Sequence, residues 1–92
     1  MREYLFNIAE RFQISGRGLV LASDVKIAEI PRVVRSGQIF EFRPPNGDAF
    51  QSRVTSVELQ SPFSPYKPLG FMVEASVQAA QVPVGTAVWL VG

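Results

Sequence analysis

The chain has 92 residues, which is enough for one domain with a single hydrophobic core and too few for a second. Hydrophobic residues make up 47% of it, which argues against disorder, and the net charge of +1 provides no strong field for attracting nucleic acid or an anionic membrane. Because the sequence contains neither Cys nor His, it excludes disulfides, zinc fingers, thiol nucleophiles and imidazole bases.

The first segment with a regular pattern covers residues 4–14. Its even-numbered positions read Tyr, Phe, Ile, Glu, Phe and Ile, a period of two that breaks only at Glu10. A helix also fits the spacing of Tyr4, Ile8 and Phe12, but the aromatic and β-branched content favours a strand. The pattern therefore predicts a long strand with a bulge at the break.

Two glycines, Gly16 and Gly18, follow this strand and are typical of a tight reversal. The apolar run over 19–22 then predicts a second strand, buried on both faces. Residues 24–35 show no clear period. Because Pro31 cannot donate to a sheet ladder, we expect an irregular connection or a short edge strand there.

The middle of the chain predicts a short strand, a turn and a further strand. Residues 38–43 place two Phe side chains on one face of a short strand, and the Pro-Pro-Asn-Gly-Asp sequence at 44–48 indicates a turn. The following strand, 50–59, changes phase along its length. A bulge near Thr55 or Ser56 would reconcile its two halves.

In the last third, the proline-punctuated stretch 61–68 predicts a loop, 69–75 predicts a strand, and 76–81 is long enough for one helical turn. The final strand, 86–91, is apolar and carries Trp89, which we assign to the core. Gln and Pro residues interrupt the uncharged C-terminal stretch, so a membrane helix is not expected. Since the first residues also lack a long apolar stretch, we expect a cytoplasmic protein.

About six short strands separated by Gly and Pro, with no sustained helix, predict an all-β fold, either a small barrel or a sandwich. A closed barrel also removes the exposed edges that an open sheet of this size would leave. We therefore expect one domain, residues 1–92, folded as a small closed six-stranded antiparallel β-barrel.

The ionisable residues give no catalytic motif. None of the eight acidic residues belongs to a close pair or a calcium-loop pattern, and the sequence has no phosphate-binding glycine loop. We expect no cofactor, no metal and no enzymatic activity, although a site built on Lys or a carboxylate stays open. Seven of the nine basic residues are Arg, which suits phosphate and base edges, but they are scattered along the chain.

Residues 12–21 (FQISGRGLVL) form a segment that ends one strand in Gly-Arg-Gly and continues as an apolar strand. Four further segments follow at 34–42 (VRSGQIFEF), 54–59 (VTSVEL), 69–73 (LGFMV) and 82–86 (VPVGT). In this order and spacing they resemble the second, β-barrel domain of elongation factor Tu and related translational GTPases. The resemblance covers nearly the whole chain and implies a similar barrel.

In the tRNA-carrying member of that family, this barrel holds the terminal adenosine of aminoacyl-tRNA in a small pocket. The resemblance implies that Glu58 lines such a pocket here, completed by Val25 and by Phe71 or Met72. It covers neither the GTPase domain nor the third barrel of the family, so GTP hydrolysis is not implied. What the resemblance implies is a docking platform.

These observations lead to two hypotheses for a non-enzymatic binding module. The first is a stand-alone, translation-factor-like adaptor that docks on a protein, favoured by the charged fraction of only 18% and by the loop aromatics Phe63 and Tyr66. The alternative is a barrel that binds RNA or the ribosome. We expect a protein partner in preference to RNA and no membrane, and a homo-oligomer stays open. The residues expected to contact a ligand or RNA are Arg17, Val25, Arg43, Arg53, Glu58 and Met72.

Overall fold

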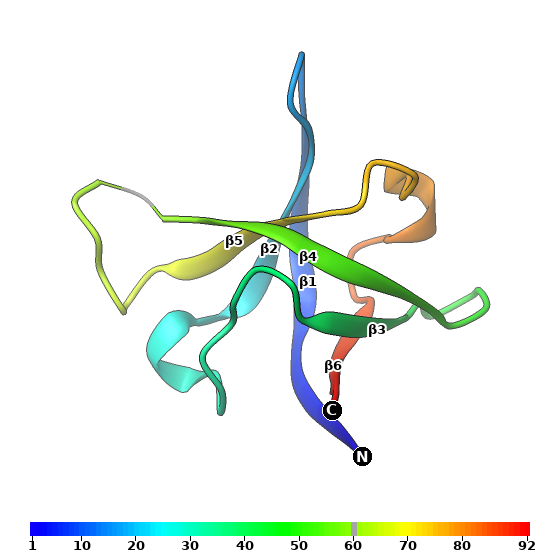
Figure 1. Ribbon diagram of the computed structural model, residues 1–92, viewed down its shortest axis with the longest axis horizontal. Helices are drawn as coiled ribbons and strands as arrows, with labels where there is room; N and C mark the ends of the chain where they lie inside the picture. The colour runs from blue at the N-terminus through cyan, green and yellow to red at the C-terminus, as the bar shows by residue number, and fades with distance from the viewer. Residues whose placement is uncertain (60) are drawn as a thin grey trace.

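In the computed structural model, which describes residues 1–59 and 61–92, six antiparallel strands close into a ring (Figure 1). Two short 3-10 turns lie in the connections of the same residues. The elements, in chain order, are β1 (Arg2–Ile14), β2 (Gly18–Lys26), η1 (Ile27–Glu29), β3 (Ile39–Arg43), β4 (Phe50–Glu58), β5 (Pro68–Val73), η2 (Ala79–Gln81) and β6 (Ala87–Val91).

The strands follow one another around the ring in the order β1-β2-β5-β4-β3-β6, and β6 pairs back onto β1. Every neighbouring pair is antiparallel. β1 pairs with two neighbouring strands. Its residues 2–7 pair with β6, and its residues 8–14 pair with β2 in a hairpin that projects from the ring (Figure 1). The predicted all-β fold with six antiparallel strands in a closed ring is confirmed.

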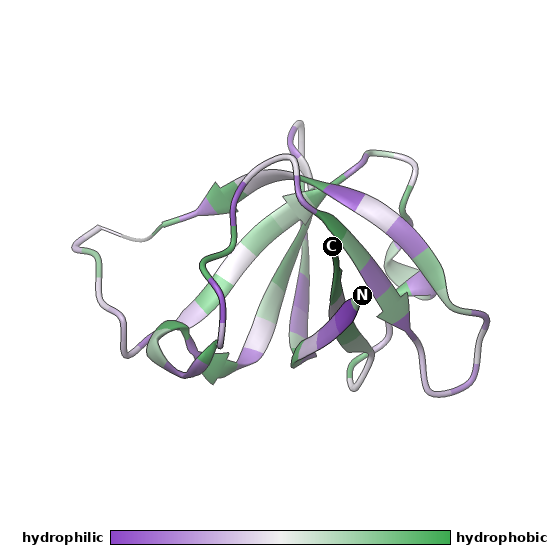
Figure 2. Ribbon diagram, turned by 60° about the horizontal axis from the view of Figure 1, so that its bottom comes forward, coloured by the Kyte–Doolittle hydropathy of each residue, from purple (hydrophilic) through white to green (hydrophobic). Residues whose placement is uncertain are grey.

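Three phenylalanines meet at the centre of the ring. Phe6 of β1, Phe71 of β5 and Phe40 of β3 are fully buried, and their ring centroids lie 5.5, 5.8 and 6.4 Å apart in edge-to-face contacts. They come from alternate strands of the ring. Figure 2 shows hydrophobic and hydrophilic residues alternating along the strands, as strands with one face toward a core require.

Register shifts decide which side chains face this core. A shift near the start of β1 turns both Leu5 and Phe6 inward. A second shift in β1 immediately precedes Glu10, and the shift in β4 falls at Thr55. Both bulges predicted from the phase of the sequence are therefore confirmed.

The reversal between β1 and β2 is also confirmed. Gly16 and Gly18 take φ angles of 79° and 118°, a region that strongly favours glycine. The predicted connection after β2 contains η1, and the predicted helical turn before the last strand is η2.

Some predicted strand boundaries were wrong. β2 runs on to Lys26, because this residue pairs with Pro68 at the start of β5. β5 ends at Val73, since Glu74 leaves the ladder and its carboxylate accepts a hydrogen bond from the backbone N–H of Arg53 at 2.9 Å.

The assignment of Trp89 to the core is also wrong. Neighbouring side chains of a strand point to opposite faces, so the fully buried Val88 places Trp89 on the outer face of β6. There its ring meets the ring of Tyr4 edge-on at 5.5 Å, and the guanidinium carbon of Arg43 lies 4.1 Å from its centroid. The indole is half-buried by these outer side chains.

The central aromatic contact gives a stability prediction. Phe71→Ala removes a fully buried ring that touches two others, and we expect it to lower the free energy of unfolding by about 3–5 kcal/mol. The matched control is Phe12→Ala, because Phe12 is 48% exposed on the projecting hairpin and should cost less than about 1 kcal/mol. Urea denaturation followed by circular dichroism measures both. Equal losses for the two variants would contradict a core centred on Phe71.

Candidate functional site

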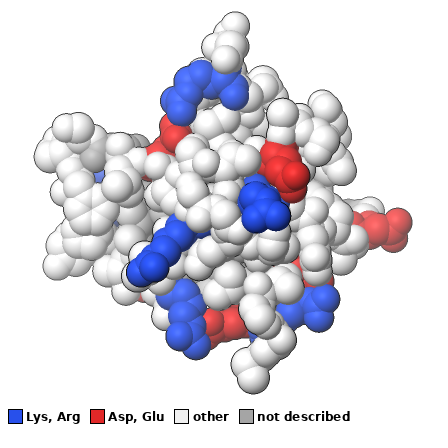
Figure 3. All heavy atoms as spheres, viewed as in Figure 1, with Lys and Arg blue, Asp and Glu red and all other residues white. Residues whose placement is uncertain are grey.

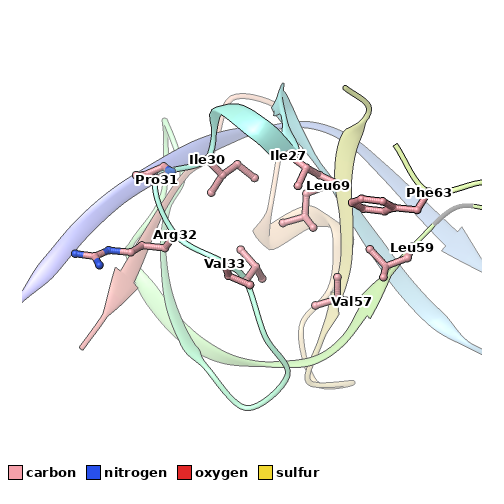
Figure 4. Close-up of a pocket in the computed structure, with 10 residues that line it drawn as sticks. Ile27, Ile30, Pro31, Arg32, Val33, Val57, Leu59, Phe63 and Leu69 are labelled. Carbon is pink, nitrogen blue, oxygen red and sulfur yellow. The ribbon is translucent and has the colours of Figure 1, made fainter. Parts of the chain in front are cut away.

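An apolar cleft lies beside the ring, between the connection that follows β2 and the connection that joins β4 to β5 (Figure 4). Its volume is about 430 Å³. Nine of the residues that line it are uncharged and the tenth is an arginine. They are Ile27, Ile30, Pro31, Arg32, Val33, Val34, Val57, Leu59, Phe63 and Leu69.

The two walls of the cleft are joined by backbone hydrogen bonds. The N–H of Ile27 donates to the carbonyl oxygen of Lys67, and the N–H of Ala28 donates to that of Pro65, each at 2.9 Å. Leu69 is buried in the hydrophobic core, so the floor of the cleft continues the core of the ring. This arrangement fixes the cleft to the core of the ring.

Three side chains on the cleft stay in solvent. Val33 is 70% exposed, Leu59 is 64% exposed and Phe63 is 57% exposed. In Figure 4, Leu59 and Phe63 lie together on one side and Val33 faces them from the connection after η1. Together with the hollow they form a continuous apolar surface, which in soluble proteins commonly marks an interaction site.

The single charged lining residue does not put its charge in the cleft. Arg32 turns its guanidinium away from the apolar side chains (Figure 4), and its Nε lies 2.7 Å from Oε1 of Glu3. The side chains that face the interior of the cleft are therefore apolar.

Three of the sequence-predicted contact residues lie together at a different place, between the projecting hairpin and β4–β5. Arg17 Nη2 donates to Glu58 Oε1 at 2.6 Å and lies 3.7 Å from the sulfur of Met72. Ser56 Oγ donates to Glu58 Oε2 at 2.8 Å. The Ser56 hydroxyl and the Arg17 guanidinium hold the pKa of the Glu58 carboxyl below its ordinary value.

The hollow next to Glu58 is open, with a volume of about 300 Å³. Its lining includes the small residues Ala9, Ala22 and Gly70, and Phe12 stands beside them. Both oxygens of the Glu58 carboxylate already accept hydrogen bonds from the chain itself. A ligand that contacts this carboxylate therefore shares it with Arg17 and Ser56.

The arginine predicted at position 43 belongs to a separate ion cluster on the ring. Glu41 is buried and its two oxygens lie 2.7 Å from Nε of Arg43 and 2.7 Å from Nε of Arg2. Hydrogen bonds from Arg43 and then from Arg2 hold the pKa of the Glu41 carboxyl below its ordinary value. Arg43 also covers Trp89, so its role here is to hold neighbouring strands together.

The two remaining members of the predicted set lie elsewhere. The Arg53 side chain donates from Nη1 to the carbonyl oxygen of Gly37 at 3.1 Å. The backbone N–H of Arg53 donates to the Glu74 carboxylate, and this hydrogen bond lowers the pKa of Glu74. Val25 is partly buried against the core. The six residues predicted to contact a ligand or RNA thus form one cluster of three and no single surface.

The two aromatics predicted to contact a protein also separate. Phe63 lines the apolar cleft, whereas Tyr66, which is 72% exposed, is not among its lining residues. The sequence interpretation missed Ile30, Val33 and Leu59 as surface residues. A signal for them existed, since the segment 27–34 is rich in apolar residues without the period of a strand.

Within residues 1–59 and 61–92, no three Asp or Glu side chains come together as they would at a metal site. No helix in this part of the chain is long and apolar enough to cross a bilayer. Comparison of the chain with protein-family models, with curated proteins and with solved structures finds no significant match in any of the three.

The geometry at Glu58 gives a pH prediction. Arg17→Gln removes one of the two donors that lower the pKa of Glu58, so we expect this pKa to rise toward the ordinary glutamate value. Because the pKa is lowered in the folded state, the pair stabilises the fold above the unfolded pKa and loses this effect as the pH falls through the folded pKa.

NMR titration of the Glu58 carboxyl measures the shift, with Arg43→Gln as the control, because Arg43 contacts Glu41 instead. The pair is partly exposed, so the difference in unfolding free energy between Arg17→Gln and the unchanged protein should stay below about 1 kcal/mol at neutral pH. That difference should vanish in acid. An unchanged Glu58 pKa in Arg17→Gln would show that the pair does not form in solution.

Proposed function

We propose that this chain is a non-enzymatic binding module, a β-barrel similar to the second domain of translational GTPases that docks on a protein partner through the apolar cleft. The observation that carries this proposal is the exposure of Val33, Leu59 and Phe63 around an uncharged hollow. These side chains are too large and too exposed to serve the core, whose contacts are made by the buried residues beneath them.

Covering this surface is favourable by the hydrophobic effect. Burial of a Leu or Phe side chain contributes about 1.5–3 kcal/mol relative to leaving it in water. Interfaces between proteins typically concentrate their binding energy in a few such side chains, with aromatic residues prominent among them. Phe63, which stands at one side of the cleft, is the residue that fits this role best (Figure 4).

The distribution of charge supports a protein partner over RNA. On the face shown in Figure 3, basic and acidic side chains adjoin one another and large uncharged areas separate them. Four arginines, at positions 2, 17, 32 and 43, are held by carboxylates of the chain. Nucleic-acid binding relies on basic residues free to neutralise phosphates, so this pairing works against it.

The RNA alternative rests on one observation, the open hollow beside Glu58. Gly70 lines this hollow, and a Cβ at this position would make ordinary van der Waals contact with Glu58 at 3.5 Å. The small residues beneath and the half-exposed Phe12 at its side provide a surface on which a flat ring could stack. We place this alternative second because the guanidinium that contacts Glu58, that of Arg17, is already paired with this carboxylate.

The test uses two variants of the same loop. Phe63→Ser removes a ring from the cleft, and Tyr66→Ser removes one that is more exposed and lies outside it. We expect a protein recovered from native lysate by the tagged protein to be recovered by Tyr66→Ser as well and to fall at least about tenfold with Phe63→Ser. Mass spectrometry of the bound fraction, with and without ribonuclease, makes the measurement.

Both rings are exposed, so thermal unfolding should confirm that both variants fold. Retention of the same partner by Phe63→Ser would contradict docking through the cleft. Recovery of RNA alone, with binding that falls steeply as salt rises, would support the RNA alternative in its place.

A further inference from the structure

We infer that the occupant of the cleft is an apolar segment of the partner protein that carries acidic side chains on its flanks. This inference rests on the proposed function and specifies the chemistry of the partner at the same site. It depends on the shape of the apolar surface and on the charges of the residues that border it.

The shape and the adjoining charges argue against a second copy of the chain and against a small ligand. Val33, Leu59 and Phe63 stand exposed around a hollow, so the surface is concave. A two-fold interface places the same surface on both sides, so it would also bring the basic residues that adjoin one cleft toward those of the second copy. A small molecule within the hollow would leave much of the three exposed side chains in water. A convex apolar segment of a different protein covers the hollow and these side chains together.

Three basic residues adjoin the lining residues of the cleft along the chain or through a backbone hydrogen bond. Lys26 immediately precedes the lining residue Ile27, and Arg35 immediately follows the lining residue Val34. Lys67 is joined to Ile27 through its carbonyl oxygen. Among residues 1–59 and 61–92, no ion pair holds any of these three cations.

The acidic residues on the same two segments are already engaged. Glu29 uses a carboxylate oxygen to accept the backbone N–H of Lys26 at 3.0 Å. Glu58 accepts hydrogen bonds from Arg17 and Ser56 on the other side of β4. Glu58 is neutralised by Arg17, whereas the bond from a neutral N–H leaves the charge of Glu29 in place. Among the described residues that adjoin the lining of the cleft, three cations outside ion pairs therefore outnumber one such carboxylate, although the net charge of the whole chain is only +1.

An excess of positive charge beside the cleft favours a partner segment with negative charge on its flanks. Charges at the rim of an interface act over about 8–10 Å in physiological salt, and they raise the association rate and reject partners of like charge. An apolar segment flanked by Asp or Glu gains from all three cations, whereas one flanked by Lys or Arg is repelled by them.

Three synthetic peptides of 16 residues test the inference with the full chain. All share the same central Leu and Phe residues, flanked by Glu in the first peptide, by Lys in the second and by Gln in the third. Fluorescence anisotropy gives each Kd at low and high salt. We expect the Glu-flanked peptide to bind about tenfold more tightly than the Gln-flanked one at low ionic strength, with the Lys-flanked peptide weakest and the differences shrinking as salt rises.

Charge-reversal variants show which basic residues cause the preference for the Glu-flanked peptide. Arg35→Glu and Lys67→Glu should each remove most of the preference for the Glu-flanked peptide, and the matched control Arg11→Glu, on the projecting hairpin, should retain it. Phe63→Ser should weaken all three peptides alike. Dodecanoate, which joins an apolar chain to a single carboxylate, serves as the small-ligand probe and should bind more weakly than the Glu-flanked peptide.

Each remaining outcome overturns the inference. Equal affinity for the three peptides, binding that survives in Arg35→Glu with its preference unchanged, tighter binding of dodecanoate, or no peptide binding would each do so. These failures are distinct from failure of the proposed function. A lysate partner that is still lost with Phe63→Ser would keep the cleft as the docking site while removing acidic flanks as its specificity.

Discussion

The contact among Phe6, Phe40 and Phe71 is the interaction on which the rest of the structure depends. Because the three rings come from alternate strands of the ring, they can meet only when all six strands are in place. The intervening strands must then curve around them, which the register shifts at the bulges allow. Aromatic packing and strand closure are thus one event, and cooperative folding of the whole chain is its expected consequence.

Closure also determines where the connections go. β2 and β5 are neighbours in the ring but are separated in sequence by two other strands, so the chain leaving β2 and the chain entering β5 run side by side. Their backbones join at Ile27 and Lys67, and the apolar side chains of both segments come to share one cleft. The candidate docking site is therefore a product of strand order, and its floor at Leu69 is part of the same core.

Some charged side chains of this molecule form ion pairs within the fold, and others do not. Glu41 and Glu58 each engage arginine on or beside the strands, and the lowered pKa of each carboxyl reflects that contact. The contacts of Arg17 with Glu58 and of Arg2 with Glu41 connect elements that are distant in sequence, whereas Arg43 and Glu41 lie on the same strand. Within residues 1–59 and 61–92, Lys26, Arg35 and Lys67, which adjoin the cleft, take no part in such pairs.

The sequence by itself determined the class of fold and its main interruptions. Alternation of side chains has a period of two, so a change of phase at Glu10 or Thr55 already marks a bulge, and two glycines mark the reversal between the first two strands. It also predicted a protein contact at Phe63, which lines the cleft in the structure and stays a prediction. Only the tertiary structure decided that Trp89 faces outward, that Arg43 and Arg53 lie apart from Glu58, and that Val33 shares a cleft with Phe63. The physical reason is that local alternation fixes the face of a strand, whereas the neighbours of a side chain depend on which strands pair, and that pairing is settled by the packing of the whole ring.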